Sequence, residues 1–350
     1  MSTQWFASRA LRELLAFGLV AMLAPSPAFA APESDPGIVS SRIPEQQAQA
    51  ATEFWTPQRM KQAKPAMPTL RGKPRPSGPS AQSSPSGPAV KINPAVSASH
   101  KATEAPEASE APVALHATTV SRPYTEDPDR LNGKVFFTSE GGLFMCSGTV
   151  INSENKSIVW TAGHCVHEGQ GGKFHKNWMF VPAYSSSSDD HRPYGTWTAR
   201  ELLTRAEWAS NSNFRQDLGA AVVKRLDKQR IVDVLGGQGI AFNQPRSQRF
   251  SAFGYPAAPP FNGFLQWRCN SRHLDNDFPT GIGSATLEIH CNMTGGSSGG
   301  GWLIDIGSNG LGLVNGLNSY RYGSTPDNLF GPYHGDEALR LYNAAQNRPA

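Results

Sequence analysis

After about residue 121, apolar residues gather in short runs that are separated by turn residues. The runs are rich in Val, Ile, Phe, Trp and Thr, and Gly, Pro, Asn or Ser lies between them, which is typical of β-strands. The predicted strands cover residues 134–138, 148–152, 157–161, 178–183, 218–224, 249–253, 285–290, 301–304 and 311–316. Many short strands with few helical stretches predict an all-β sandwich or barrel.

Two segments have helical patterns. Near the C-terminus, Ala338, Leu339, Leu341 and Tyr342 form an apolar face, and we expect Asp336 to cap this helix. A short helix is expected at residues 57–62, with Thr56 as its cap and Pro57 at its first position.

The N-terminus has the pattern of a secretory signal peptide. Arg9 and Arg12 precede an apolar run at residues 14–24, and Ala28-Phe29-Ala30 supplies small residues for a signal peptidase. The run is too short to cross roughly 30 Å of hydrocarbon as a helix. We therefore expect residues 1–30 to be cleaved off and the remainder to be secreted, extracellular protein.

Residues 31–120 differ in composition from the strands that follow. The stretch 61–94 is crowded with Pro, Ser, Gly and Lys, and the stretch 101–112 is rich in Ala, Glu and Pro. Such segments bury too little apolar surface to offset the entropy lost on ordering. The expected organisation is a disordered pro-segment or linker over 31–120 and one folded domain over 121–350.

Charge and cysteine content narrow the class of protein. A formal net charge of +4 over 350 residues gives no reason to expect nucleic acid or an anionic membrane as a partner. Four cysteines in an exported chain indicate two disulfides, for which three pairings are possible. Their order favours Cys146–Cys165 and Cys269–Cys291, each of which closes a short loop.

Three motifs carry candidate chemistry, in the order His, Asp, Ser. The string TAGHC (161–165) sets His164 beside a disulfide at the end of a strand, where a general base would be held firmly. Asp217 opens an apolar run, and its carboxylate can orient an imidazole. The string GGSSGGG (295–301) places Ser298 in a glycine-rich turn, where the Gly296 and Ser298 amides can form an oxyanion hole.

With these motifs the chain resembles the trypsin/chymotrypsin-like serine peptidases, and among them the bacterial secreted branch. The matching strings are CSGTV (146–150), WTAGHC (160–165), DL (217–218), FGYP (253–256) and GSSGG (296–300), within about residues 125–345. The resemblance implies two packed antiparallel β-barrels with the site between them. It also implies a serine endopeptidase in which Ser298 attacks the carbonyl, His164 acts as general base and then acid, and Asp217 supports His164. We expect protein or peptide substrates, a monomer, and neither a cofactor nor a metal ion.

Ser297 departs from the pattern of the family. Many zymogens of the family have an Asp before the nucleophile, which pairs with a newly freed N-terminal amine on activation. A hydroxyl cannot make that charge-assisted pair, so we expect the oxyanion loop to be held otherwise, with Cys269–Cys291 as a candidate. Asn292 or Met293 is expected near the base of the specificity pocket and residues 314–320 along its wall. Because Asn292 is neutral, a preference for Lys or Arg is not supported.

Three other interpretations remain open. The Gly-x-Ser-x-Gly string also occurs at the nucleophile elbow of α/β-hydrolases, with Asp305, Asp327 and His334 as candidate partners, but that fold needs alternating strands and helices before the elbow. A metal site at His164, His167 and Glu168 would rest on a spacing that is common by chance. A catalytically inactive homologue would use the same fold as a secreted binding protein.

Overall fold

The computed structural model describes residues 35–75, 87–97, 113, 116–185 and 192–350. The predicted signal peptide lies outside the described residues, and so do parts of the predicted pro-segment. Within the described ranges, no helix is both long enough and apolar enough to span a membrane.

The first half of the 121–350 region is a closed, six-stranded antiparallel barrel. Its strands are β6 (Asn132–Ser139), β7 (Gly142–Ile151), β8 (Ile158–Thr161), β9 (Lys176–Pro182), β10 (Trp197–Arg205) and β11 (Gly219–Val223). Pairing of β10 with β9 closes the ring. Val135, Val159 and Leu202 are fully buried in its core, as the β-branched and apolar runs of these strands require.

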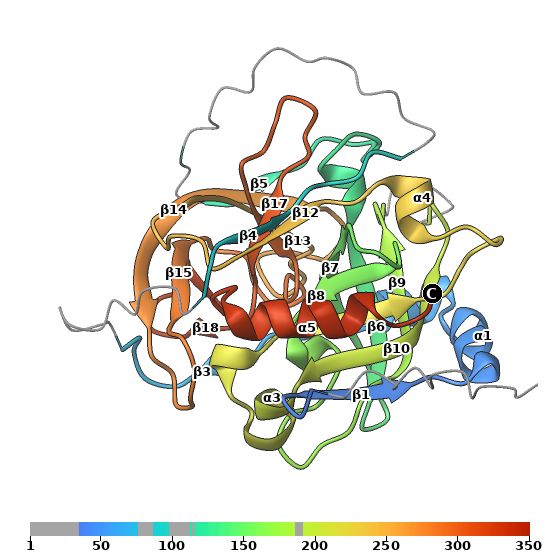
Figure 1. Ribbon diagram of the computed structural model, residues 1–350, viewed down its shortest axis with the longest axis horizontal. Coiled ribbons are helices and arrows are strands. Elements are labelled where there is room, and N and C mark those ends of the chain that lie inside the picture. Colours follow the sequence, from blue (N-terminus) through green and yellow to red (C-terminus); the bar gives the residue numbers. More distant parts are fainter. Residues whose placement is uncertain (1–34, 76–86, 98–112, 114–115, 186–191) are drawn as a thin grey trace, which may run out of the picture. The chain divides into compact units, whose positions relative to one another are not determined.

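The second half is a larger sheet that is mostly antiparallel. It runs in the order β19 (Asn328–Gly331), β15 (Thr286–His290), β14 (Trp267–Asp277), β13 (Arg249–Gly254), β16 (Gly301–Ile304), β17 (Leu313–Leu317) and β12 (Gly239–Phe242). Trp302 and the Cys269–Cys291 disulfide lie in its core. β13 of this sheet contacts β6 of the barrel, so the two halves pack together (Figure 1). The predicted all-β, chymotrypsin-like arrangement is confirmed.

The predicted C-terminal helix is present as α5 (Asp336–Gln346), which contacts β10, β11 and β12. Ala338, Leu341 and Tyr342 of the predicted face are buried. The predicted cap is wrong, because Gly335 is the N-cap residue and Asp336 lies in the first turn, where its carboxylate accepts a hydrogen bond from Asn243. The 121–350 region also contains the short helices α3 (Ala206–Asn211) and α4 (Ile231–Leu235).

In the 31–120 region, the described residues form strands and helices, so the prediction of disorder is wrong for these residues. They form β1 (Ile38–Arg42), α1 (Glu45–Phe54), α2 (Pro57–Gln62), β2 (Lys64–Pro65), β3 (Thr69–Leu70), β4 (Val90–Ile92) and β5 (Thr118–Thr119). The helix predicted at 57–62 is confirmed, including the bond from Arg59 N–H to the Thr56 side chain.

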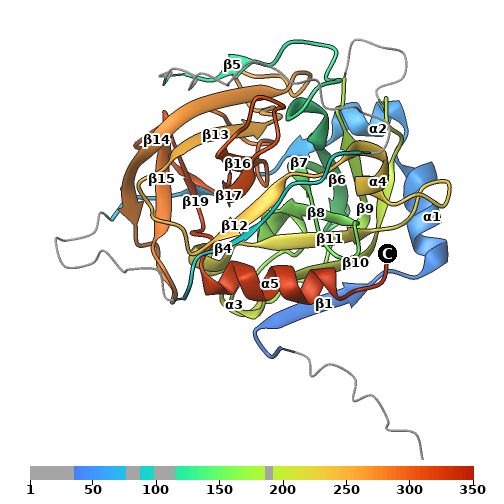
Figure 2. The ribbon, with the colours of Figure 1, turned by 45° about the horizontal axis from the view of Figure 1, so that its top comes forward.

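Each of these N-terminal strands adds to a strand of the later domain. β1 pairs with β10, β4 with β12 and β5 with β14 (Figure 2). Trp55 and Met60 are buried against residues of the barrel. The composition of residues 31–120 indicates how little apolar surface this segment could bury by itself. Hydrogen bonds and core contacts with the 121–350 domain stabilise the segment in the folded protein.

Candidate active site

His164 lies in a tight 3₁₀ turn, Gly163–Cys165, that directly follows β8 and Ala162. The disulfide from Cys165 to Cys146 ties this turn to β7. The His164 carbonyl also accepts a hydrogen bond from Nε2 of His175 at 2.9 Å. Burial lowers the pKa of His175 to about 4, so this ring is neutral near pH 7 and serves as a fixed donor. The His164 turn is therefore held from two sides.

Asp217 is fully buried and lies directly against the His164 loop. Its Oδ1 accepts the His164 main-chain N–H at 2.7 Å, and its Oδ2 accepts from His164 Nδ1 at 2.7 Å. The Ser319 hydroxyl donates to the same Oδ2 at 2.5 Å. Three donors thus hold one carboxylate, and the bond to Nδ1 leaves Nε2 as the free acceptor of the imidazole.

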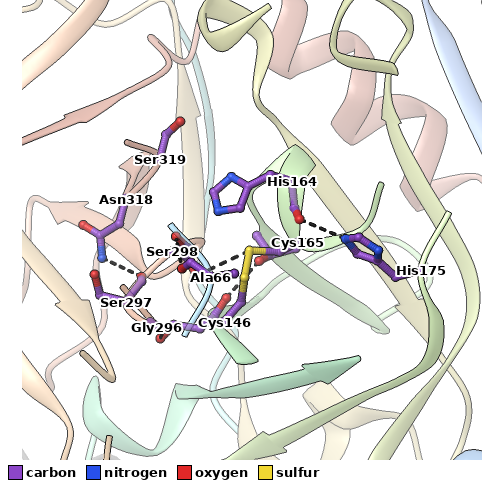
Figure 3. Close-up of a disulfide and its surroundings, with 12 residues drawn as sticks. Ala66, Cys146, His164, Cys165, His175, Gly296, Ser297, Ser298, Asn318 and Ser319 are labelled. Atoms are coloured by element: carbon purple, nitrogen blue, oxygen red, sulfur yellow. Dashed lines mark hydrogen bonds between the residues drawn. A yellow bond between two sulfur atoms is a disulfide. The ribbon is translucent and has the colours of Figure 1, made fainter. Parts of the chain in front are cut away.

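Ser298 lies in the glycine turn between β15 and β16, against the barrel that carries His164. Its carbonyl accepts the Ser147 N–H at 2.7 Å and lies 3.7 Å from Cys165 Sγ. Gly296 and Gly299 have φ values of +98° and +81°, a region that residues with a Cβ rarely adopt. Figure 3 shows Ser298 close to the disulfide and the His164 ring.

The predicted oxyanion loop is held by Asn318 and by Ser297 itself. The Asn318 side chain donates to the Ser297 carbonyl at 2.9 Å, and its main-chain carbonyl accepts from Gly299 N–H at 2.7 Å. The Ser297 hydroxyl donates to the Thr294 carbonyl at 2.8 Å. These bonds hold the loop next to the predicted nucleophile, whereas Cys269–Cys291, the candidate named from the sequence, lies in the core of the second sheet.

A main-chain carbonyl from the N-terminal region occupies the site. The Ala66 oxygen accepts hydrogen bonds from Gly296 N–H at 3.0 Å and from the Ser298 hydroxyl at 2.8 Å (Figure 3). His164 Nε2 is buried and has no hydrogen-bond partner among the residues that the structure describes. The predicted oxyanion donor Gly296 N–H and the predicted nucleophile thus both bind this carbonyl, and Ser298 is not hydrogen bonded to His164.

A cavity of about 250 Å³ opens beside His164. Ala66, Phe137, Phe144, Glu168 and His175 are among the residues that line it.

Of the two residues expected near the base of the specificity pocket, Met293 is buried, while Asn292 accepts a hydrogen bond from Ala117 N–H at 2.9 Å. The side-chain oxygen of Asn292 is therefore hydrogen bonded within the protein.

The alternative site residues do not converge on Ser298. His334 is fully buried and accepts a hydrogen bond from Trp160 Nε1, and Asp305 pairs with Lys91. Potential metal-ligating atoms of Cys146, His164 and Cys165 lie within 4.8 Å of one another. Because both sulfurs belong to the disulfide, they cannot act as thiolate ligands.

Sequence reasoning missed Ser319, Asn318, His175 and Ala66 at this site. Asn318 and Ser319 lie within residues 314–320, the run expected to form a pocket wall, but no motif marks their bonds to Asp217 and to the Ser298 loop. Ala66 acts through its backbone, so its residue type carries no signal.

An all-β fold of two packed halves, with an Asp-bound histidine facing a serine in a glycine turn, defines the chymotrypsin-like class. The chain is 44% identical to the protease Anisep from Arthrobacter nicotinovorans, over 64% of this chain and 99% of that one, with a TM-score of 0.58. It is 43% identical to the thermostable serine protease AL20 from an extremophilic microorganism, over 63% of this chain and 99% of that one, with a TM-score of 0.57.

A Glu endopeptidase shares the fold at 16% identity and a TM-score of 0.53, with 66% of this chain and 97% of that one covered. No protein-family model and no curated protein matches the chain. On the identities to Anisep and AL20, the chain belongs to the trypsin/chymotrypsin-like serine peptidase family.

Proposed function

We propose that this protein is a secreted serine endopeptidase that hydrolyses peptide bonds through an acyl-enzyme on Ser298. His164 takes the proton of the Ser298 hydroxyl and passes it to the leaving amine, while Asp217 holds the imidazole in the required tautomer. The Gly296 and Ser298 amides stabilise the oxyanion. The observation that carries the proposal is the 2.7 Å bond between buried Asp217 and His164 Nδ1, which leaves Nε2 available as base.

The protein is exported as a zymogen, and residues 1–30 are its signal peptide. Two disulfides support an oxidising compartment. The carbonyl bound at Ser298 supports a precursor in which the N-terminal region must leave the site before substrate can enter. Protein or peptide substrates and a monomeric enzyme are part of the same proposal.

Reaction with a fluorophosphonate probe tests the proposal. The processed protein, recovered after export, should carry the phosphonate on Ser298, as determined by peptide mapping. Ser298→Ala and His164→Ala should not react, although both should remain folded. Ser251→Ala is the matched control, because it also removes one serine hydroxyl, which lies on β13 and donates to Asn270 at 2.8 Å. If the processed wild-type protein stays unlabelled, it is an inactive homologue.

A further inference from the structure

Residues 64–70, named here the 64–70 segment, cross the candidate active site from one half of the fold to the other. β2 pairs with β7 of the barrel, and the Ala66 N–H donates to the Met145 carbonyl at 3.0 Å. Further along, the Pro68 carbonyl accepts from Arg321 N–H at 3.2 Å, and β3 pairs with β18 (Arg321–Tyr322). The Ala66 carbonyl lies between these two pairings, at Gly296 and Ser298.

The contacts at Ala66 separate the nucleophile from its base. The Ser298 hydroxyl donates to the carbonyl oxygen and therefore does not donate to His164 Nε2, which has no hydrogen-bond partner in the described part of the chain. Attack requires the hydroxyl oxygen to approach the carbonyl carbon while its proton moves to the imidazole. The bound segment thus occupies the Gly296 donor in an arrangement that does not lead to attack.

The direction of the segment is opposite to the direction that the chemistry requires. His164 must protonate the leaving amine, and the Cys146–Cys165 disulfide ties the His164 turn to β7. The leaving half of a productive peptide therefore lies along β7, and the acyl half lies along β18. In the 64–70 segment, the residues before the Ala66 carbonyl lie along β7 and the residues after it lie along β18. The Ala66–Met67 amide nitrogen consequently lies on the wrong side of the carbonyl for protonation.

Two side chains anchor the segment on the second half of the fold. Met67 packs against the cluster that contains Met293 and the Cys269–Cys291 disulfide. Leu70 packs against the cluster of Tyr320, Tyr322 and Phe330. Pro65 and Pro68 restrict the backbone of the free segment, which lowers the entropy lost on docking.

We propose that the 64–70 segment is a built-in inhibitor that fills the catalytic cleft in reverse, so that it blocks Ser298 and is not cleaved there. This inference rests on the proposed function, because it assigns the regulation of the same site. The surface it defines fits an extended peptide with prolines and with apolar side chains at the positions of Met67 and Leu70.

Variants of the full-length, unprocessed chain test the blocking role. Met67→Asp with Leu70→Asp should release the segment, because each carboxylate would face an apolar cluster. The labelling rate of Ser298 by the fluorophosphonate should then rise more than about tenfold, as expected from losing the burial of two apolar side chains. Thr69→Asp is the matched control, since its side chain is exposed and its labelling should stay slow. Met67→Ala with Leu70→Ala is a milder pair of substitutions. The melting temperature of each variant shows whether it is folded when its labelling rate is measured. Folded variants that label no faster than wild type would overturn the blocking role.

Cleavage mapping tests the direction. When wild-type precursor is activated by a trace of the released double variant, new termini should arise away from the Ala66–Met67 bond. New termini at Met67 in the wild-type precursor would show that the segment binds as a substrate, and would overturn reverse docking.

Hydrogen exchange separates this inference from the proposed function. In the inactive Ser298→Ala chain, the Ala66 amide should be protected by its bond to Met145, and the protection should disappear in the chain with the two added aspartates. Loss of protection in Ser298→Ala alone would overturn the docked segment, whatever the enzyme does. Protection combined with a processed protein that never labels would instead overturn the proposed activity.

Discussion

His164 and Ser298 stand on loops that are held in different ways. The His164 turn is held by a covalent bond, Cys146–Cys165, and by side chains, since Asp217 binds both its main-chain N–H and its ring. The Ser298 turn is held largely through backbone atoms, with glycines that let the chain pass close to Ser147 and Asn318.

The difference follows from what each loop must supply. A general base must present one ring nitrogen in one tautomer, which requires a fixed side-chain partner. An oxyanion site must present N–H groups, which requires a fixed backbone conformation with no Cβ in the way. Side-chain substitutions around the His164 turn should therefore lower activity most. Substitutions that disturb the backbone conformation of the Ser298 turn should lower the free energy of unfolding most.

The largest expected effect is that of Asp217→Asn on turnover. The amide can present its N–H₂ to Nδ1 and so favour the wrong imidazole tautomer, which should lower kcat by about 10⁴-fold. The check is steady-state kinetics of the processed enzyme on a peptide substrate. Asp305→Asn is the control, because this carboxylate is exposed and pairs with the exposed Lys91 at 2.8 Å. Equal kcat in the two variants would contradict the assigned role of Asp217.

Removing each disulfide separately should lower the free energy of unfolding in both cases but lower kcat in only one. The bonds close loops of similar length, with sequence separations of 19 and 22, so each should contribute about 3 kcal/mol to the free energy of unfolding. Cys146→Ala with Cys165→Ala should also lower kcat, because the His164 turn loses its tie to β7. Cys269→Ala with Cys291→Ala should leave kcat nearly unchanged. Denaturant unfolding and kinetics of both pairs provide the comparison, and an equal loss of kcat would contradict it.

Gly299→Ala tests the backbone side of the comparison. A Cβ there would overlap Thr161 Oγ1 and lie 2.5 Å from the Ser147 carbonyl, at a φ of +81°. The free energy of unfolding should fall by about 2–4 kcal/mol. Gly323→Ala is the matched control, because a Cβ at Gly323 would meet no atom within 4 Å, and its effect should stay within about 0.5 kcal/mol.

The smallest expected effect is the pH dependence contributed by His175. Burial lowers its folded-state pKa to about 4 from 6.5, so folding favours the neutral ring. Its stabilising contribution is present above pH 6.5 and is lost as the pH falls toward 4. Between pH 6.5 and 5, the free energy of unfolding should fall by about 1–2 kcal/mol more in wild type than in His175→Gln. Urea titrations at both pH values measure this difference, and parallel curves would contradict it.

Much of the fold follows from local pattern. Every strand predicted from apolar runs coincides with a strand, because β-branched and aromatic runs bounded by turn residues encode β-structure locally. The predictions missed β12 and β19, which are only four residues long each. They also missed β10 and β14, since β10 carries Arg, Glu and two Leu and β14 is mainly polar. Both owe their conformation to pairing partners on each side, which a single segment does not reveal.

The sequence by itself determined the class of protein and the side chains that we propose to carry its chemistry, because histidine beside cysteine and serine among glycines are marked by residue type. Only the tertiary structure decided that the 64–70 segment is ordered, that it lies across the site, and in which direction it runs. The physical reason is that its key contact is a backbone carbonyl, the same in every residue, and that the stabilisation of a proline-rich segment comes from the surface on which it docks.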